Sequence, residues 1–185
     1  EVGTFMIAGV LNPDSELTLE GCNVDHLGNL PELLSKTGAK VDVNGTTIKV
    51  QAPKELEAVS IATEVYPGFP TDMQAQWATM MTQANGVSTV TDTVYYDRFS
   101  YVPELTRLGA DMRLEKNTVT IFGKTDFEGA SVMSTDLRAS VSLVLAAMVA
   151  ENETEVLRVY HLDRGYENLE HKLNAVGAKI KRVDE

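Results

Sequence analysis

The sequence contains a single cysteine, Cys22, which excludes an internal disulfide framework and suits a reducing compartment. It has no apolar run long enough to span a bilayer and no basic-then-apolar leader, so we expect a soluble, cytoplasmic protein. Basic residues are few, because 16 Lys and Arg oppose 27 Asp and Glu and leave a formal charge of −11. This excess of acid argues against nucleic acid and against a membrane as partners.

Several chemical motifs are also missing. There is no glycine-rich phosphate loop, no nucleophile elbow and no metal-binding motif. The three histidines, His26, His161 and His171, share no ligand spacing with one another or with Cys22. We therefore expect neither a metal nor a cofactor, and we expect Cys22 to be a buried or loop thiol.

What the chain does have is internal repetition. The dipeptide Gly-Ala follows a helix-like segment three times, about 70 residues apart, at Gly38, Gly109 and Gly177. Upstream, the pattern Thr-x-(Met or Leu)-x-Ala recurs from Thr4, Thr71 and Thr135. The sequence therefore predicts one domain over 1–185, made of three repeats at 1–53, 54–124 and 125–185.

Each repeat predicts the order strand, helix, strand, helix, strand, strand. Leading strands are expected at 58–63 and 129–134, first helices at 72–83 and 136–150, and middle strands at 16–20, 86–93 and 153–160. The three glycines can supply left-handed caps that end the second helices. Hairpins of 40–43 with 46–50, around Asn44-Gly45, and of 111–114 with 119–122 follow these helices. The predicted fold class is α/β (α+β), with sheets whose inner faces are buried against helices.

The first repeat is expected to be incomplete. The chain opens where the other two repeats are already entering their first helix, so repeat one lacks a leading strand. The third repeat ends on 180–183 without a return strand. This pattern indicates a piece of a longer chain, with a sheet edge that another segment would cover.

The start of the helix at 72–83 carries the first candidate for chemistry. Thr71 and Gln74 have the spacing of a capping box, and Pro70 keeps the entry extended. The following apolar residues recur at the spacing of one helical face, from Met73 to Ala84. Asp72 is off that face and near the positive end of the helix, where an acid can simply complement the helix dipole.

Three arginines lie where stability alone would not place them. Arg138 falls in the first turn of a predicted helix, where a cation is unfavourable by about 0.3–1 kcal/mol. Arg98 and Arg164 occupy matching positions shortly before the second helices of repeats two and three. Each could pair with a neighbouring Asp. Three arginines at helix starts in an acidic chain nevertheless favour an anion-binding clamp.

Beside such a clamp, Asp72 could act as a general base toward a bound hydroxyl or carbon acid. Asp136 holds the equivalent place in the third repeat, and we expect it to orient Arg138 or to cap its helix. Tyr95 and Tyr96 are expected to pack in a sheet or core rather than to bind a ligand.

Four segments carry a resemblance to a known family. The runs are Phe69 to Gln76, Asp97 to Phe99, Thr135 to Ser140 and Tyr160 to Tyr166. In order, they resemble the later half of the UDP-N-acetylglucosamine 1-carboxyvinyltransferase family of enolpyruvyl transferases. The resemblance implies an inside-out α/β barrel of two domains, each with three βαβαββ units, of which this chain would be one with its first repeat incomplete.

The resemblance also implies an activity, which is transfer of the enolpyruvyl group from phosphoenolpyruvate to the 3-hydroxyl of UDP-N-acetylglucosamine with release of phosphate, the first committed step of peptidoglycan synthesis. Asp72 would be the base for that hydroxyl and a contact of the UDP-sugar. Val94 would be a second contact of the nucleotide sugar. Arg98, Arg138 and Arg164 would line the phosphoenolpyruvate site, with Asp136 in support.

The family's proton-donating cysteine and its early Lys-Asn pair have no counterpart here, and Cys22 does not match that cysteine. The resemblance therefore implies a missing partner domain and no activity for these 185 residues alone. Two alternatives stay open. One is the related shikimate-pathway transferase, and the other is a non-catalytic scaffold module on the same fold.

Overall fold

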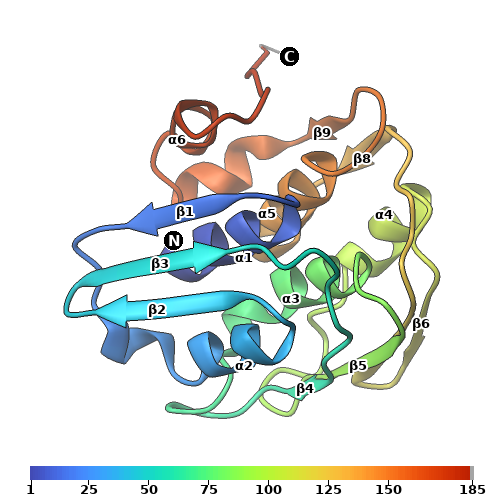
Figure 1. Ribbon diagram of the computed structural model, residues 1–185. Coiled ribbons are helices and arrows are strands. Elements are labelled where there is room, and N and C mark those ends of the chain that lie inside the picture. The colour runs from blue at the N-terminus through green and yellow to red at the C-terminus, as the bar shows by residue number, and fades with distance from the viewer. Residues whose placement is uncertain (184–185) are drawn as a thin grey trace.

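Three helices that are buried on nearly every side occupy the centre of the fold (Figure 1). They are α1 (Val2–Leu11), α3 (Gln74–Met81) and α5 (Leu137–Ala147) in the computed structural model, which describes residues 1–183. All 8 residues of α3 and 8 of the 10 residues of α1 are buried. A helix that is covered all round belongs to an interior rather than to a surface. The sheets and the other helices therefore surround a helical centre.

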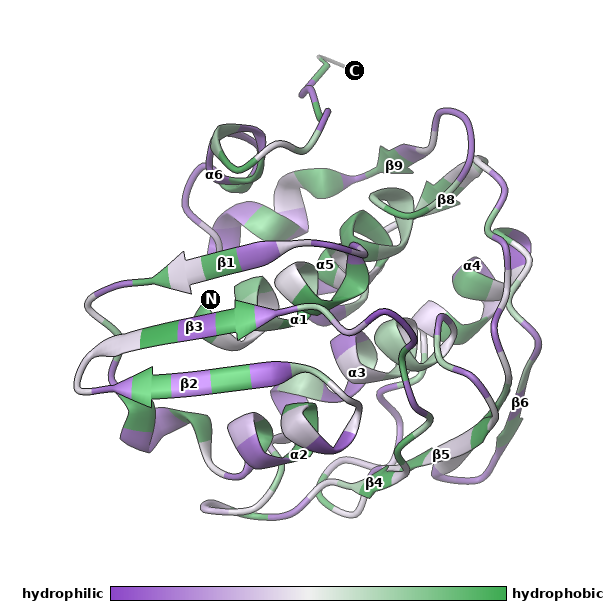
Figure 2. Ribbon diagram, in the orientation of Figure 1, coloured by the Kyte–Doolittle hydropathy of each residue, from purple (hydrophilic) through white to green (hydrophobic). Residues whose placement is uncertain are grey.

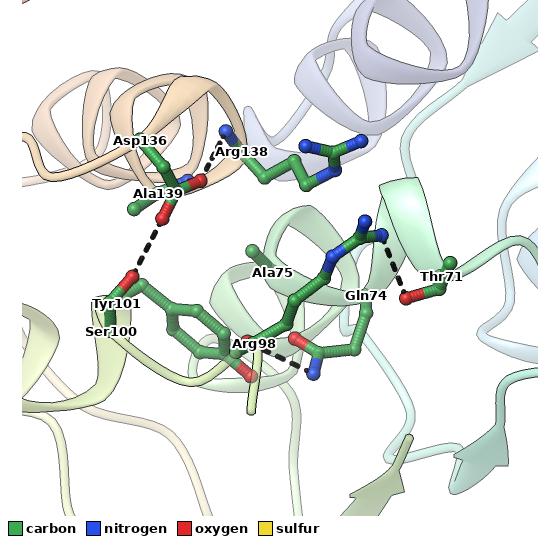
Figure 3. Close-up of a pocket in the computed structure, with 9 residues that line it drawn as sticks. All are labelled: Thr71, Gln74, Ala75, Arg98, Ser100, Tyr101, Asp136, Arg138 and Ala139. Carbon is green, nitrogen blue, oxygen red and sulfur yellow. Dashed lines mark hydrogen bonds between the residues drawn. The ribbon is translucent and has the colours of Figure 1, made fainter. Parts of the chain in front are cut away.

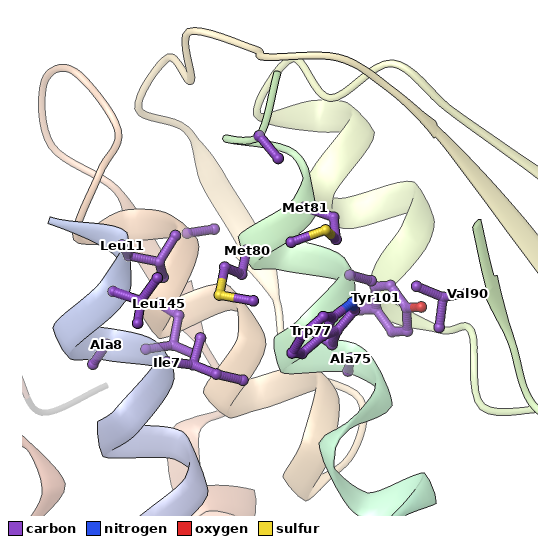
Figure 4. Close-up of a cluster of buried hydrophobic side chains, with 14 of the residues drawn as sticks. Ile7, Ala8, Leu11, Ala75, Trp77, Met80, Met81, Val90, Tyr101 and Leu145 are labelled. Carbon is purple, nitrogen blue, oxygen red and sulfur yellow. The ribbon is translucent and has the colours of Figure 1, made fainter. Parts of the chain in front are cut away.

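Large apolar side chains from these helices meet in one core (Figure 4). Ile7 from α1, Met80 from α3 and Leu145 from α5 are at most 1% exposed. Trp77 lies edge-on to Phe69, with ring centroids 5.3 Å apart, and its indole N–H donates to the Val59 carbonyl at 3.1 Å. The expectation of a single apolar face on this helix is too narrow, because the polar residues of α3 are buried as well.

The strands form three separate sheets. The first has the order β1 (Glu16–Leu19), β3 (Thr47–Gln51), β2 (Lys40–Asn44), and all its pairs are antiparallel. The second has the order β4 (Ile61–Ala62), β5 (Val87–Thr91), β7 (Thr118–Phe122), β6 (Met112–Glu115), and the third pairs β8 (Ser131–Met133) with β9 (Glu155–Leu157). Hydrophobic and hydrophilic residues alternate along β2 and β3 (Figure 2), as expected for strands with one face on a core.

A second set of helices follows the middle strands, and each ends shortly before a glycine. They are α2 (Leu30–Lys36), α4 (Tyr101–Arg107) and α6 (Leu169–Ala175), each preceded or entered by short 3₁₀ turns or loops. Gly38, Gly109 and Gly177 have φ values of 93°, 111° and 106°. These left-handed values confirm the predicted helix stops, since residues with a Cβ rarely adopt them.

Comparison of the sheets shows the predicted repeat. In the second sheet β4 pairs with β5 in parallel, and in the third β8 pairs with β9 in parallel. The first sheet has no described strand in the place beside β1 that β4 takes beside β5. The predicted α/β class with an incomplete first repeat is therefore confirmed. The exact repeat boundaries stay predictions, and residues 184 and 185 of the third repeat lie outside the described residues.

Some predicted elements are wrong in detail. The strand expected over 153–160 ends at Leu157, because Arg158 has a φ of 59° and the 3₁₀ segment η3 (Val159–Arg164) follows. Over 180–183 no strand forms; instead the Asn174 side chain exchanges two hydrogen bonds with the backbone of Ile180. The leading strand expected at 58–63 is reduced to Ile61–Ala62.

The first hairpin also turns one residue later than expected. Asn44 pairs with Thr47, so the two loop residues are Gly45 and Thr46 rather than Asn44 and Gly45. Only Gly45 of the two has a positive φ, at 59°. A positive φ at the first loop residue alone belongs to a type II′ turn, which requires glycine there.

Among the described residues, no helix combines the length and the apolar character needed to cross a lipid bilayer.

Met80 offers a test of the helical centre. Met80→Ala should lower the free energy of unfolding by about 2–5 kcal/mol, because the truncation leaves a cavity among three helices. Urea unfolding followed by Trp77 fluorescence measures this loss. Val65→Ala, at a side chain that is 78% exposed, is the control and should change stability by less than about 0.5 kcal/mol. Equal effects of the two changes would contradict the buried position of α3.

Candidate functional site

The Asp72 carboxylate accepts hydrogen bonds from two arginines that are distant from it in the sequence. Asp72 lies in the 3₁₀ turn η2 (Thr71–Met73), and its side chain is 65% exposed. Its Oδ1 accepts from Arg98 Nη1 at 3.0 Å and from Arg138 Nε at 2.6 Å. Arg98 comes from the loop between β5 and α4, and Arg138 from the first turn of α5. The structure thus brings together three of the residues that the sequence predicted for one site.

Arg98 is fixed by several further contacts. Its Nη1 also donates to Thr71 Oγ1 at 3.0 Å, and its guanidinium carbon lies 4.6 Å from the centroid of the Tyr95 ring. The Arg98 carbonyl accepts from Gln74 Nε2 at 3.2 Å. Figure 3 shows the Arg98 side chain reaching toward Thr71, with Arg138 extending from α5 on the same side. The Arg98 side chain is only 24% exposed, so its position is defined by the fold.

Asp136 caps the helix that carries Arg138. Its Oδ1 accepts from the backbone N–H groups of Arg138 at 2.8 Å and Ala139 at 3.1 Å, and its Oδ2 accepts from the Ser100 hydroxyl at 2.8 Å. Burial opposes ionisation, but the hydrogen bonds from Ala139, Ser100 and Arg138 outweigh it and hold the pKa of Asp136 below its ordinary value. Both oxygens are therefore engaged by protein donors, as a helix cap requires.

Arg164 lies beside Arg138 rather than at Asp72. It is the last residue of η3, and with Arg138 it lines an open cavity of about 320 Å³. The other lining residues are Thr135, Asp136, Leu137 and His161. Arg138 thus belongs both to the Asp72 cluster and to this cavity. Two guanidinium groups at the start of an 11-residue helix make the cavity suited to an anion.

The loop after β5 holds the remaining predicted contact. Val94 is 41% exposed, and its backbone N–H donates to Asp92 Oδ1 at 3.0 Å. The prediction that Tyr95 and Tyr96 pack inside the protein is wrong, since they are 52% and 67% exposed. The loop turns outward here because its backbone is tied to Asp92 instead of continuing the β5 ladder.

Asp92 is the residue that the sequence interpretation missed. It is fully buried and accepts four hydrogen bonds, from Thr63 Oγ1 and Thr71 Oγ1, both at 2.6 Å, and from the N–H groups of Val94 and Tyr95. Burial would raise the pKa of Asp92, but these donors lower it below the ordinary value. An acid at a strand end whose side chain bonds the N–H groups two and three residues on is a recognisable turn signal.

The capping box predicted at Thr71 is also wrong. Thr71 lies inside the 3₁₀ turn, with Pro70 at its N-cap, and its Oγ1 accepts from Arg98 instead of from the Gln74 backbone N–H. The Gln74 amide donates to the Arg98 carbonyl instead of reaching back to the helix start. The Asp92 carboxylate takes the Thr71 proton, which leaves the Thr71 oxygen to accept from Arg98.

The other possibilities were a reactive thiol at Cys22 and a metal site. Cys22 is 4% exposed at the end of β1 and carries a free thiol. Over residues 1–183, no three His, Cys, Asp or Glu side chains are grouped as metal ligands would be. What the site offers is one exposed carboxylate in contact with Arg98 and Arg138, and a third guanidinium group, Arg164, in the adjoining cavity. Such a set can bind a multiply charged anion next to a proton acceptor.

Comparison with known proteins gives three findings. Residues 1–173 match the protein-family model described as EPSP synthase (3-phosphoshikimate 1-carboxyvinyltransferase). The proteins named UDP-N-acetylglucosamine 1-carboxyvinyltransferase from Chlorobaculum parvum and Thermodesulfovibrio yellowstonii are each 50% identical to the chain, over 98% and 99% of it but only 43% and 44% of their own lengths. The chain therefore spans less than half the length of these curated relatives.

Two solved structures resemble the fold of this chain. The enolpyruvyl transferase NikO from Streptomyces tendae matches 97% of the chain and 43% of its own chain, with a TM-score of 0.89 and 29% identity. EPSP synthase from Acinetobacter baumannii matches 99% of the chain and 46% of its own, with a TM-score of 0.83. At 16% identity the second likeness concerns the fold alone.

Asp136 gives a prediction for stability. Asp136→Ala should lower the free energy of unfolding by about 1 kcal/mol at neutral pH, because α5 loses its N-cap. The folded-state pKa of Asp136 is depressed, so its contribution is fully present above the unfolded pKa of about 3.9 and is lost as the pH falls through the folded pKa. The difference between wild type and Asp136→Ala should therefore shrink in acid.

Urea unfolding at pH 7 and at a series of values below 4 measures this difference. Asp111→Ala, at an exposed acid, is the matched control and should have a smaller effect at neutral pH. A difference for Asp136→Ala that grows as the pH falls would show that the carboxylate does not stabilise the helix start.

Proposed function

The chain belongs to the EPSP synthase (3-phosphoshikimate 1-carboxyvinyltransferase) family, and on this premise we propose that it forms one part of an enolpyruvyl transferase. The donor is phosphoenolpyruvate, and the acceptor is the 3-hydroxyl of UDP-N-acetylglucosamine. The relatives with 47–50% identity that carry the name of that activity support this choice of acceptor. The enzyme would act in the cytoplasm in peptidoglycan synthesis, and through the cell wall it would bear on cell shape, the cell cycle and cell division.

The observation that carries the proposal is the ion-pair cluster of Asp72 with Arg98 and Arg138. Phosphoenolpyruvate has a phosphate and a carboxylate, so its site must supply several cations within a few ångströms. Arg138 and Arg164 line one cavity at the start of α5, and Arg98 adjoins it through the shared contact with Asp72. These three arginines would bind the donor.

Asp72 would serve as the proton acceptor. The oxygen of the acceptor hydroxyl attacks the central carbon of phosphoenolpyruvate, and its proton passes to the Asp72 carboxylate. The methylene carbon takes up a proton from a donor outside this chain, which gives a tetrahedral intermediate. Loss of a proton from that carbon and of phosphate then forms the enolpyruvyl ether. The arginines hold the anionic groups throughout, as fixed cations do without reorganisation.

Binding of phosphoenolpyruvate would also change the contacts of Asp72. Asp72 Oδ1 accepts from both Arg98 and Arg138, whereas a phosphate or carboxylate at those guanidinium groups would compete for the same donors. Binding of the donor would then release the Asp72 carboxylate to face the acceptor hydroxyl. Val94, which is exposed on the loop that carries Arg98, would contact the nucleotide sugar. Asp136 would support the site by capping the start of α5.

Part of the machinery would come from another domain. The relatives are more than twice the length of the chain, and the family's proton-donating cysteine and its lysine have no counterpart here. We therefore expect the chain to be inactive alone and to need the other domain of the same enzyme as its partner.

The alternative acceptor is shikimate 3-phosphate, which the description of the matching family favours. In the full-length protein, phosphate release from phosphoenolpyruvate should depend on UDP-N-acetylglucosamine and should be absent with shikimate 3-phosphate. A coupled phosphate assay with each acceptor measures this. Turnover only with shikimate 3-phosphate would assign the protein to the other activity, and turnover with neither would favour a non-catalytic module.

Arg138 and Asp72 test the proposed roles. In the full-length protein, Arg138→Ala should lower kcat/KM for phosphoenolpyruvate by about 100-fold or more, because a fixed cation at the reacting anion is lost. Asp72→Asn should mainly lower kcat, because it removes the proton acceptor. Steady-state phosphate release measures both effects.

Arg107→Ala is the matched control. Arg107 is an arginine of α4 whose side chain is 61% exposed and 3.7 Å from Glu104, so its loss should leave kcat/KM within about twofold. Unchanged turnover in Arg138→Ala and Asp72→Asn would rule out the catalytic role of the cluster.

A further inference from the structure

We propose that Asp92 is a positioning residue for the donor site, which acts on Arg98 through the Thr71 hydroxyl and through the backbone of the loop that carries Arg98. The inference rests on the proposed function, since it takes the arginine cluster as the place where phosphoenolpyruvate binds. Asp92 itself lies behind the site and is fully buried.

The Thr71 hydroxyl connects Arg98 to Asp92, with a fixed direction of hydrogen bonding. It donates to Asp92 Oδ2 at 2.6 Å and accepts from Arg98 Nη1 at 3.0 Å. A hydroxyl has one proton, and an ionised carboxylate can only accept, so Asp92 fixes the direction in which the Thr71 proton points. The lone pairs of Thr71 then face Arg98. Asp92 thus keeps an acceptor in place for a guanidinium group that also contacts Asp72.

The second route runs through the backbone. Asp92 Oδ1 accepts from the N–H groups of Val94 at 3.0 Å and Tyr95 at 2.8 Å, which fixes the turn that leads to Arg98. The same loop places the Tyr95 ring 4.6 Å from the Arg98 guanidinium carbon. One carboxylate therefore sets both the path of the loop and the acceptor for the side chain at its end.

Four hydrogen bonds keep the buried Asp92 carboxylate ionised, as its lowered pKa indicates. All four of its donors are neutral groups, and the hydroxyl of Tyr101 is buried without a hydrogen-bond partner within the described residues. Burial, with the negative charge of Asp92 in addition, raises the pKa of that hydroxyl well above its ordinary value. A neutral side chain in place of Asp92 would not fix the direction of the Thr71 proton.

Asp92→Asn separates the two routes. The amide oxygen can replace Oδ1 and keep the hydrogen bonds from Thr63, Val94 and Tyr95. The amide nitrogen then replaces Oδ2 and must donate to Thr71, so the hydroxyl reverses and its proton competes with Arg98. In the full-length protein, Asp92→Asn should raise the KM for phosphoenolpyruvate about tenfold and leave kcat within about threefold.

Thr63→Val is the matched control for stability. It removes the other hydroxyl that donates to Asp92, but Thr63 bonds Oδ1 and not Oδ2, the oxygen that is linked to Arg98 through the Thr71 hydroxyl. Its melting temperature should fall about as far as that of Asp92→Asn, while its KM for phosphoenolpyruvate stays within about twofold of wild type. Thr71→Ser keeps the hydroxyl and should also keep the KM. An equal rise in KM for Asp92→Asn and Thr63→Val would overturn the proposal.

A double-mutant cycle tests the link itself. If Asp92 acts on Arg98 through the Thr71 hydroxyl, Thr71→Val already breaks the link, and adding Asp92→Asn should raise the KM by less than about twofold more. If the KM of the double variant rises by the product of the two single effects, Thr71 and Asp92 act independently. That result would contradict the proposed route.

A binding readout distinguishes this inference from the proposed function. Inorganic phosphate is titrated into the full-length protein, and the NMR signals of the arginine side-chain N–H groups are followed. Asp92→Asn should weaken phosphate binding about tenfold and Thr63→Val should not. If wild type releases no phosphate with either acceptor, the proposed function fails while this titration still decides the role of Asp92. Equal phosphate affinity in wild type and Asp92→Asn overturns it.

Discussion

The packing of α1, α3 and α5 against one another determines where Asp72 and Arg138 lie. These helices are buried on almost all sides, so their directions and separations are set by side chains that cannot move without opening a cavity. The starts of α3 and α5 therefore lie side by side, and both contribute to the small pocket of Figure 3. Asp72 and Arg138 meet because of this apolar contact deeper in the protein, and their own attraction adds little, since Asp72 is largely exposed.

The sequence was sufficient to predict the fold class and the gathering of charge. The recurring Gly-Ala marks real left-handed helix stops at Gly38, Gly109 and Gly177, and two of the three predicted arginines, Arg98 and Arg138, contact one carboxylate. Local patterns have this power because a glycine cap and a misplaced cation each have a physical cost that is visible without a structure.

The rest depended on contacts between distant residues. The capping box at Thr71 failed because the Thr71 oxygen accepts from Arg98, 27 residues further on, and no spacing rule includes such a partner. The burial of Gln74 and Gln76 on α3 could not be inferred from helical periodicity, since it comes from distant segments, among them the Arg98 carbonyl and Thr4 that accept from their amides. Tyr95 and Tyr96 were expected inside because aromatic residues pack well, but the backbone bonds to Asp92 turn their loop outward.

One further feature of the first sheet affects any work with this chain in solution. β1 forms an edge of that sheet, whereas its counterparts β5 and β9 each pair with a parallel strand on the corresponding side. An uncovered row of backbone N–H and C=O groups is a template for a strand from another molecule. Self-association through β1 would depend on protein concentration, so the amount of protein in the tube becomes a variable in every measurement made on the chain by itself.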